Sequence, residues 1–205
     1  IDGSYSEAAI RMDNCAFCDF SNNTITNRPS RGIWVDNGFT TTINNNTIDP
    51  QYDGIRAEDG SFLTINNNVI NEFEEYGIQF NSSENSTVNY NRITSINNHQ
   101  YWKMGIYNAN TNQNAIVNYN YIEIGDFNNL NWDDEHYYGI RVYDSEVKFD
   151  TVIIFMKCGG YGVRADRSTI EDNYIKVFQQ YDCSAIEAIE SYGDQNNRNS
   201  IKNNT

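Results

Sequence analysis

Two stretches of the chain, residues 94–104 and 123–138, hold the side chains best suited to acid–base chemistry. They contain both histidines of the sequence, and the unperturbed pKa of histidine lies near neutrality. The second stretch also carries neighbouring carboxylates in the segment W-D-D-E-H, and a carboxylate pair can hydrolyse a glycosidic bond. The alternative is an acidic loop exposed to solvent. The candidate catalytic residues of these stretches are His99, His136, Asp133 and Glu135.

Three reactions suit these residue types. The first is β-elimination from a uronic acid, with His136, Arg141 or Tyr107 as the base and an arginine or a calcium ion neutralising the substrate carboxylate. The second is glycoside hydrolysis by Asp133 and Glu135. The third is metal-dependent chemistry on the acidic loop. No cofactor is required by the first two, calcium is the candidate ion, and no set of metal ligands can be named.

The elements that position these residues come from a repeat. Residues 42–48 read T-I-N-N-N-T-I and residues 64–70 read T-I-N-N-N-V-I, with weaker copies at 87–93, 116–122 and 169–175. Alternating residues predict half-buried strands, and the polar pair between them predicts a bend. We expect the second residue of each pair to take the left-handed backbone conformation and its side chain to join a hydrogen-bonded ladder. The predicted ladder is Asn23, Asn46, Asn68, Asn91, Asn120, Asp150, Asn173 and Asn204.

A second pattern has the same period, a small residue followed by a branched apolar one, as in Gly54-Ile55 and Ala185-Ile186. Successive spacings of the apolar residue are 23, 22, 23, 28, 34, 23 and 23, which is typical of a solenoid. We predict an all-β parallel β-helix of about eight coils with three strands each, and residues 1–205 as a single domain. Because the chain begins and ends inside the repeat, we expect it to be part of a longer protein.

Alternation also predicts three inward stacks of apolar side chains, which together form the core. The first stack is Ile10, Ile33, Ile55, Ile78, Ile106, Ile140, Val163 and Ile186. The second is Phe20, Ile43, Ile65, Val88, Val117, Val147, Ile170 and Ile201. The third is Ile25, Ile48, Ile70, Ile93, Ile122, Val152 and Ile175.

The motifs G-I-x-x and T-I-x-N-N-x-I at this period resemble the right-handed parallel β-helix of pectate lyases and related repeat proteins, over residues 7–205. The resemblance implies a single-stranded right-handed solenoid with an asparagine ladder in the second turn. It also implies a substrate groove on the first-strand sheet, here over coils 4–7 beside the long loops. The chain departs from the family because it lacks the N-T-D, D-D, G-H-G and R-I-K set of polygalacturonases and the Arg-x-x-Pro-x-x-Arg signature of pectate lyases.

Outward positions of the first-strand sheet carry arginine, aromatic and amide side chains, which can stack on sugars and hydrogen-bond to hydroxyl or uronate groups. The alternative is charge pairing between strands without a ligand, as in Arg56 with Glu58 or Arg164 with Asp166. The candidate substrate-binding residues are Trp34, Arg56, Gln79, Trp102, Trp132, Tyr138 and Arg164, with Tyr107 and Arg141 in the same row.

The net charge of −14 disfavours nucleic acid and anionic membranes as partners, and no apolar run is long enough to span a membrane. Cys158 and Cys183 lie about one period apart, and Cys15 and Cys18 form a C-x-x-C motif. We predict that each pair forms a disulfide, hence an exported protein; the alternative is buried free thiols.

Two functions follow from these observations. The first is an extracellular or cell-surface solenoid segment of adhesin, stalk or filament type, with a glycan-binding face and with end-to-end self-assembly as a further expectation. It rests on the negative charge, the uniform coils and the missing catalytic motifs. The second is a polysaccharide lyase or glycoside hydrolase that acts on an extended polysaccharide, and it rests on the histidine, tyrosine and arginine side chains in and after the long loops.

Overall fold

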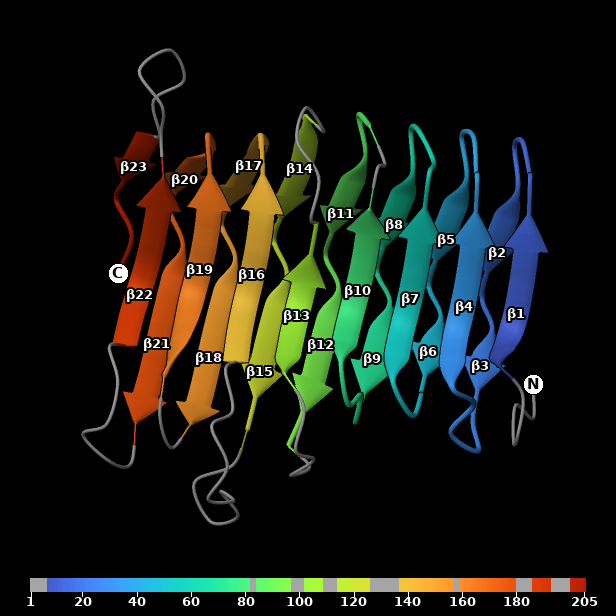
Figure 1. The fold of residues 1–205 in the computed structure, drawn as a ribbon, viewed down its shortest axis with the longest axis horizontal. Helices are drawn as coiled ribbons and strands as arrows, with labels where there is room; N and C mark the ends of the chain where they lie inside the picture. The colour runs from blue at the N-terminus through green and yellow to red at the C-terminus, as the bar shows by residue number, and fades with distance from the viewer. Residues whose placement is uncertain are drawn as a thin grey trace.

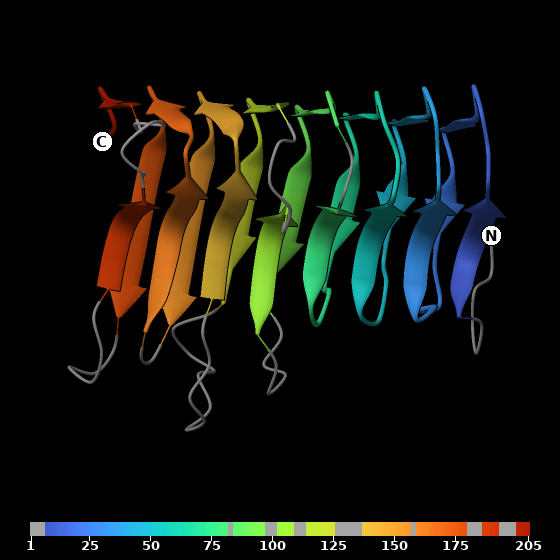
Figure 2. The ribbon, with the colours of Figure 1, turned by 45° about the horizontal axis from the view of Figure 1, so that its top comes forward.

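The chain folds into three parallel sheets that run side by side along one axis (Figure 1). The computed structural model describes residues 7–81, 84–96, 102–108, 114–125, 137–156, 159–179, 186–192 and 200–205. Within these ranges every regular element is a strand. The coils follow one another in sequence order from the N-terminus to the C-terminus (Figure 2), so the predicted solenoid is confirmed.

The first sheet carries the candidate site, and each of its eight strands pairs with the corresponding strands of the neighbouring coils. Its strands are β1 (Ala8–Asp13), β4 (Arg31–Asp36), β7 (Asp53–Glu58), β10 (Tyr76–Asn81), β13 (Lys103–Tyr107), β16 (Tyr137–Tyr143), β19 (Gly160–Asp166) and β22 (Ile186–Tyr192).

The second and third sheets close the coil. The second sheet consists of β2 (Asp19–Ser21), β5 (Thr42–Asn44), β8 (Thr64–Asn66), β11 (Thr87–Asn89), β14 (Ala115–Asn118), β17 (Ser145–Lys148), β20 (Thr169–Glu171) and β23 (Ser200–Lys202). The third consists of β3 (Thr24–Ile25), β6 (Thr47–Ile48), β9 (Val69–Asn71), β12 (Arg92–Ser95), β15 (Tyr121–Ile124), β18 (Thr151–Met156) and β21 (Tyr174–Gln179).

The predicted apolar stacks form most of the core, which also contains side chains outside them, such as Val35 and Phe73. At the last coil the prediction of an inward side chain is wrong for Ile201, which is 49 % exposed. The second and third stacks pair in the predicted register from end to end. The first stack is correct through Val163, but the next coil places Ile189 opposite it and not Ile186. The error arises because Ala-Ile-Glu occurs twice in succession, at 185–187 and 188–190, and the regular spacing favoured the first copy.

The predicted asparagine ladder is present inside the second turn. The side-chain amide of Asn46 donates to Asn68 Oδ1 at 2.9 Å, and that of Asn68 donates to Asn91 Oδ1 at 3.0 Å. The expected backbone conformation was assigned to the wrong residue, however, because the residue before each ladder position has the positive φ. These residues are Asn22, Asn45, Asn67, Tyr90, Tyr119, Phe149, Asp172 and Asn203, with φ between 51° and 61°.

The regular spacing of glycine on the first sheet has a steric cause, shown by Gly54. A Cβ at Gly54 would lie 2.5 Å from the Gly77 carbonyl oxygen and 2.5 Å from Ile70 Cγ2. The strand therefore packs directly against the next coil and the third sheet, which fixes the direction of the side chains that follow it.

Candidate functional site

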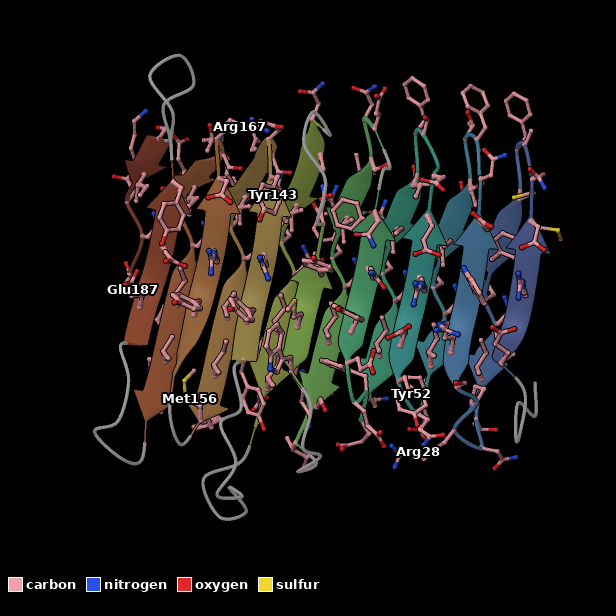
Figure 3. The ribbon with its side chains drawn as sticks, viewed as in Figure 1. Arg28, Tyr52, Tyr143, Met156, Arg167 and Glu187 are labelled. Atoms are coloured by element: carbon pink, nitrogen blue, oxygen red, sulfur yellow. The ribbon has the colours of Figure 1, made fainter. Side chains whose placement is uncertain are left out.

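The outward surface of the first sheet carries two adjoining columns of polar and aromatic side chains, which we call the arginine–aromatic face. The first column is Arg31, Asp53, Tyr76, Met104, Tyr138, Tyr161 and Glu187. The second is Arg11, Trp34, Arg56, Gln79, Tyr107, Arg141, Arg164 and Glu190. In Figure 3, Tyr143 at the carboxyl end of β16 and Glu187 on β22 mark the C-terminal part of this face.

The structure brings most of the predicted binding residues together. Six of them occupy one column in consecutive coils, from Trp34 through Arg164, and Tyr138 lies in the adjoining column. Trp102 precedes β13, outside both columns, and is 57 % exposed. Five predicted residues lie outside the described part of the chain: His99, His136, Asp133, Glu135 and Trp132.

The ring faces of this surface are covered by other protein groups. Tyr76 and Tyr107 stack with their centroids 5.2 Å apart, and Tyr138 and Tyr161 stack at 5.1 Å. The Trp34 ring contacts guanidinium groups, among them that of Arg11 at 4.0 Å. The expectation that these rings stack on sugars is therefore unsupported. The guanidinium groups beside these rings carry hydrogen-bond donors.

The charge-pairing alternative holds for part of the face. Arg56 pairs with Glu58 at 2.8 Å, as predicted. Arg164 pairs with Glu190 at 3.0 Å, and no ion pair joins it to Asp166 in the described residues. Pairing therefore explains much of the alternation of arginine and acid without any ligand.

Arg141 differs from the other arginines of the face. Its guanidinium carbon lies 5.6 Å from the Tyr107 ring centroid and 5.4 Å from that of Tyr138, so two rings hold it in place. Within the described residues no carboxylate lies at ion-pair distance of its guanidinium; the buried Nε also has no hydrogen-bond partner there, but this is equally true of Arg56 and Arg164. Arg141 thus has a fixed, planar cation that no carboxylate of the described residues neutralises.

Asp53 and Arg31 belong to the same surface and were missed by the sequence analysis. Asp53 is fully buried, and its Oδ2 lies 3.0 Å from Arg31 Nε and 3.6 Å from Arg56 Nη1. Burial raises the pKa of the Asp53 carboxyl to about 6, although both arginines lower it. The sequence signal that could have identified them is their position, because Arg31 and Asp53 each directly precede the glycine of the repeat.

Tyr107 is a poor base near neutral pH. Burial raises the pKa of its phenol, outweighing the opposite effect of Arg141. The phenol therefore stays protonated and serves as a hydrogen-bond donor or acceptor. Tyr107 lies beside Arg141, and both side chains are able to form hydrogen bonds.

The architecture agrees with the comparison of the chain with known families. The sequence model described as "Right handed beta helix region" matches residues 4–122, more than half of the 205 residues. This chain belongs to the right-handed β-helix family. No curated protein matches it.

Solved structures similar to this β-helix include the catalytic domain of a GH87 α-1,3-glucanase in complex with nigerose. It shares 15 % identity at a TM-score of 0.29 and covers 89 % of this chain and 48 % of that one. A variant of the same domain with nigerose gives 15 % identity, a TM-score of 0.29 and coverages of 90 % and 48 %. This β-helix spans about half the length of these structures.

The cysteines of the β-helix differ in part from the prediction. Cys15 and Cys18 are free thiols, so the predicted local disulfide is absent: Cys15 is buried beside Thr41 Oγ1 at 3.5 Å. A hydrogen bond with Cys15, assisted by burial, raises the pKa of the Cys18 thiol to about 11. The other predicted pair, Cys158 and Cys183, lies outside the described residues.

Two further features concern ions and membranes. Across the described ranges, no three His, Cys, Asp or Glu side chains are grouped to hold a metal ion, so a calcium site stays a prediction. The same ranges contain no helix with the length and apolar character needed to cross a membrane.

Proposed function

We propose that this β-helix binds an extended, acidic polysaccharide along the arginine–aromatic face, and that Arg141 contacts a carboxylate of the sugar chain. The observation that carries the proposal is the guanidinium of Arg141, which pairs with no carboxylate of the described residues. Arg56 and Arg164 are neutralised by protein carboxylates, whereas the groups that hold the Arg141 guanidinium within the described ranges are tyrosine rings. A planar guanidinium binds a carboxylate through two parallel hydrogen bonds.

The geometry of the sheet supports an elongated ligand. Parallel strands repeat at about 4.8 Å, so equivalent side chains recur along the whole face. Buried polar atoms without a hydrogen-bond partner in the described residues lie in several coils of it, including Trp34 Nε1, Gln79 Oε1 and Arg141 Nε. These atoms have almost no accessible surface, so contact with a ligand falls to the partly exposed side chains of the face, such as that of Arg141.

The wider role that we propose is a binding segment outside the cell or on its surface, of adhesin, stalk or filament type. An extended acidic polysaccharide is a partner met in that setting, and the stacked coils supply a rigid surface for it. The evidence for binding comes from the face itself, and the polysaccharide is the proposed partner.

The test compares binding of acidic and neutral polysaccharides by wild type and by Arg141→Gln. A matched control is Arg92→Gln, because Arg92 also lies over a tyrosine, Tyr121 at 4.9 Å, but on the third sheet. Loss of a charged hydrogen bond costs about 1.5–3 kcal/mol, so Arg141→Gln should weaken acidic-polysaccharide binding about tenfold or more. Equal binding by wild type and Arg141→Gln would refute the assignment.

A further inference from the structure

The N-terminal half of the arginine–aromatic face contains a carboxylate buried beneath two guanidinium groups. Asp53 has no exposed surface, whereas the side chains of Arg31 and Arg56 are 22 % and 23 % exposed. Both arginines therefore reach the ligand side of the face while Asp53 Oδ2 holds them from below. The second oxygen, Oδ1, is buried and has no hydrogen-bond partner in the described residues.

The arginines of this cluster also hold a second, more exposed carboxylate each. Arg56 pairs with Glu58 at 2.8 Å, and Arg31 lies 3.8 Å from Glu7. A ligand carboxylate can displace these exposed partners from the outer side. It cannot remove Asp53, which stays in place below and repels the incoming charge.

We propose that Asp53 is a protonation switch for the arginine–aromatic face: in its neutral form it releases Arg31 and Arg56 to bind a carboxylate of an acidic polysaccharide, and in its ionised form it competes with that carboxylate. The inference rests on the proposed function and adds its regulation. Binding and protonation are coupled, so each favours the other.

The groups around Asp53 support a switch in the mildly acidic range. Arg31 on β4 and Arg56 on β7 lower the pKa of the carboxyl, while burial, the largest influence, and Glu75 before β10 raise it, to about 6. Tyr76 on β10 also faces it, and its phenol has a raised pKa because of burial. As the pH falls through 6, Asp53 gains a proton and the cluster loses one negative charge.

The direction in which ligand affinity changes with pH depends on which carboxylate gains a proton first. Uronic-acid carboxylates stay ionised at pH 5.5, so a drop from pH 7.5 to 5.5 changes Asp53 before it changes the ligand. Affinity for an acidic oligosaccharide should increase as the pH falls, by at most about tenfold per pH unit, the limit for uptake of one proton. Affinity for a neutral oligosaccharide should change little.

The experiment is calorimetric titration with a uronic-acid tetrasaccharide and its carboxyl-reduced neutral counterpart, at pH 5.5 and 7.5, in buffers of different ionisation enthalpy. Wild type should bind the acidic probe more tightly at pH 5.5 and take up protons on binding. Asp53→Asn should bind it equally at both pH values without proton uptake. Asp36→Asn, which changes a carboxylate on the neighbouring strand, is the matched control and should keep the wild-type pH dependence.

Acidic-probe binding that is independent of pH in the wild type, or pH dependence retained by Asp53→Asn, would overturn the switch while leaving the proposed binding function intact. Failure of wild type to bind either probe at either pH would overturn both. If Asp53→Asn does not fold, the carboxyl carbon of Asp53 is titrated by NMR in free and saturated wild type. The ligand must then raise the pKa of Asp53, and an unchanged titration rejects the proposal.

Discussion

One position of the asparagine ladder holds an acid, and replacing it should stabilise the protein. Asn120 and Asn173 each donate twice through the side-chain amide, to the next ladder residue at 2.9 and 3.0 Å and to a carbonyl at 2.8 and 2.9 Å. Asp150 has no amide nitrogen. Its Oδ1 accepts from Asn120, and its buried Oδ2 has no hydrogen-bond partner in the described residues.

The loss of unfolding free energy caused by an acid at this ladder position depends on pH. Burial raises the pKa of the Asp150 carboxyl well above its ordinary value, against the smaller effect of its hydrogen bonds with Asn120. In the unfolded chain the carboxyl loses its proton at about pH 4, whereas in the folded chain its raised pKa lets it keep the proton to higher pH. The contribution of Asp150 to the free energy of unfolding is therefore complete below about pH 4 and declines above it, by about 1.4 kcal/mol per pH unit, until the folded group ionises.

Asp150→Asn should remove this loss and restore the missing donor. An asparagine side chain can donate two hydrogen bonds, whereas a neutral Asp150 can donate at most one, so the variant should gain about 1 kcal/mol even at low pH. The difference in unfolding free energy should then grow as the pH increases. No comparable effect is expected from Asp172→Asn, because Asp172 is exposed and occupies a bend position where other coils already have Asn.

Urea denaturation of wild type, Asp150→Asn and Asp172→Asn at pH 4.5, 6.0 and 7.5 measures this difference. The change between variants isolates one carboxyl from the other groups that titrate in this range. If Asp150→Asn were no more stable than wild type at pH 7.5, or if its advantage were the same at every pH, the ladder position would not hold a neutral acid and the reasoning would fail.

Three further outcomes follow from packing and from thiol chemistry. Ile65→Ala, at a fully buried stack position, should lower the free energy of unfolding by about 2–5 kcal/mol through lost burial and a cavity, measured in urea; a loss below that of an exposed substitution would show the inward assignment to be wrong. Gly54→Ala should lower the free energy of unfolding by about 1–3 kcal/mol, because its Cβ would lie 2.5 Å from both the Gly77 carbonyl oxygen and Ile70 Cγ2; unchanged stability would show that neighbouring coils can move apart to accommodate the methyl group. Cys18, with a thiol pKa raised to about 11 by Cys15 and burial, should react slowly with iodoacetamide at pH 8 by mass spectrometry, and rapid labelling would contradict the hydrogen bond.

The repeat made the core predictable because every inward position recurs at a fixed phase. Ile43 and Ile65 illustrate this: each sits between an outward Thr and an outward Asn, and a shift of one residue would expose it. The inward residue of the final coil could not be predicted from the phase of the repeat. Ile186 and Ile189 each follow Ala and precede Glu, so only pairing with Val163 distinguishes them.

The bend shows a different limit of sequence-based prediction. The preference of Asn for left-handed backbone pointed to the wrong residue of the pair. Asn favours left-handed backbone, yet Tyr90, Tyr119 and Phe149 adopt φ near 57°, where a bulky residue is disfavoured by about 1–2 kcal/mol. Their rings stack at 5.0 Å in both steps, which offsets part of that cost. Because the ladder requires its amides inside the coil, the preceding residue must adopt the left-handed backbone conformation whatever its side chain.

The sequence already distinguishes Arg141 from the other arginines of the face when the strand register is taken into account. Arg11, Arg56 and Arg164 are each followed two residues later by an acid, which shares their side of the strand, whereas Arg141 is followed by Tyr143. Its neighbours in the column are Tyr107 and Arg164, and neither can neutralise it. The composition is that of an acidic protein, but pairing along the columns leaves Arg141, in the C-terminal part of the face, without a carboxylate partner among the described residues. For that reason the missing negative charge is best sought on a ligand, and Arg141 is the residue at which a glycan-binding surface is distinguished from a self-paired sheet.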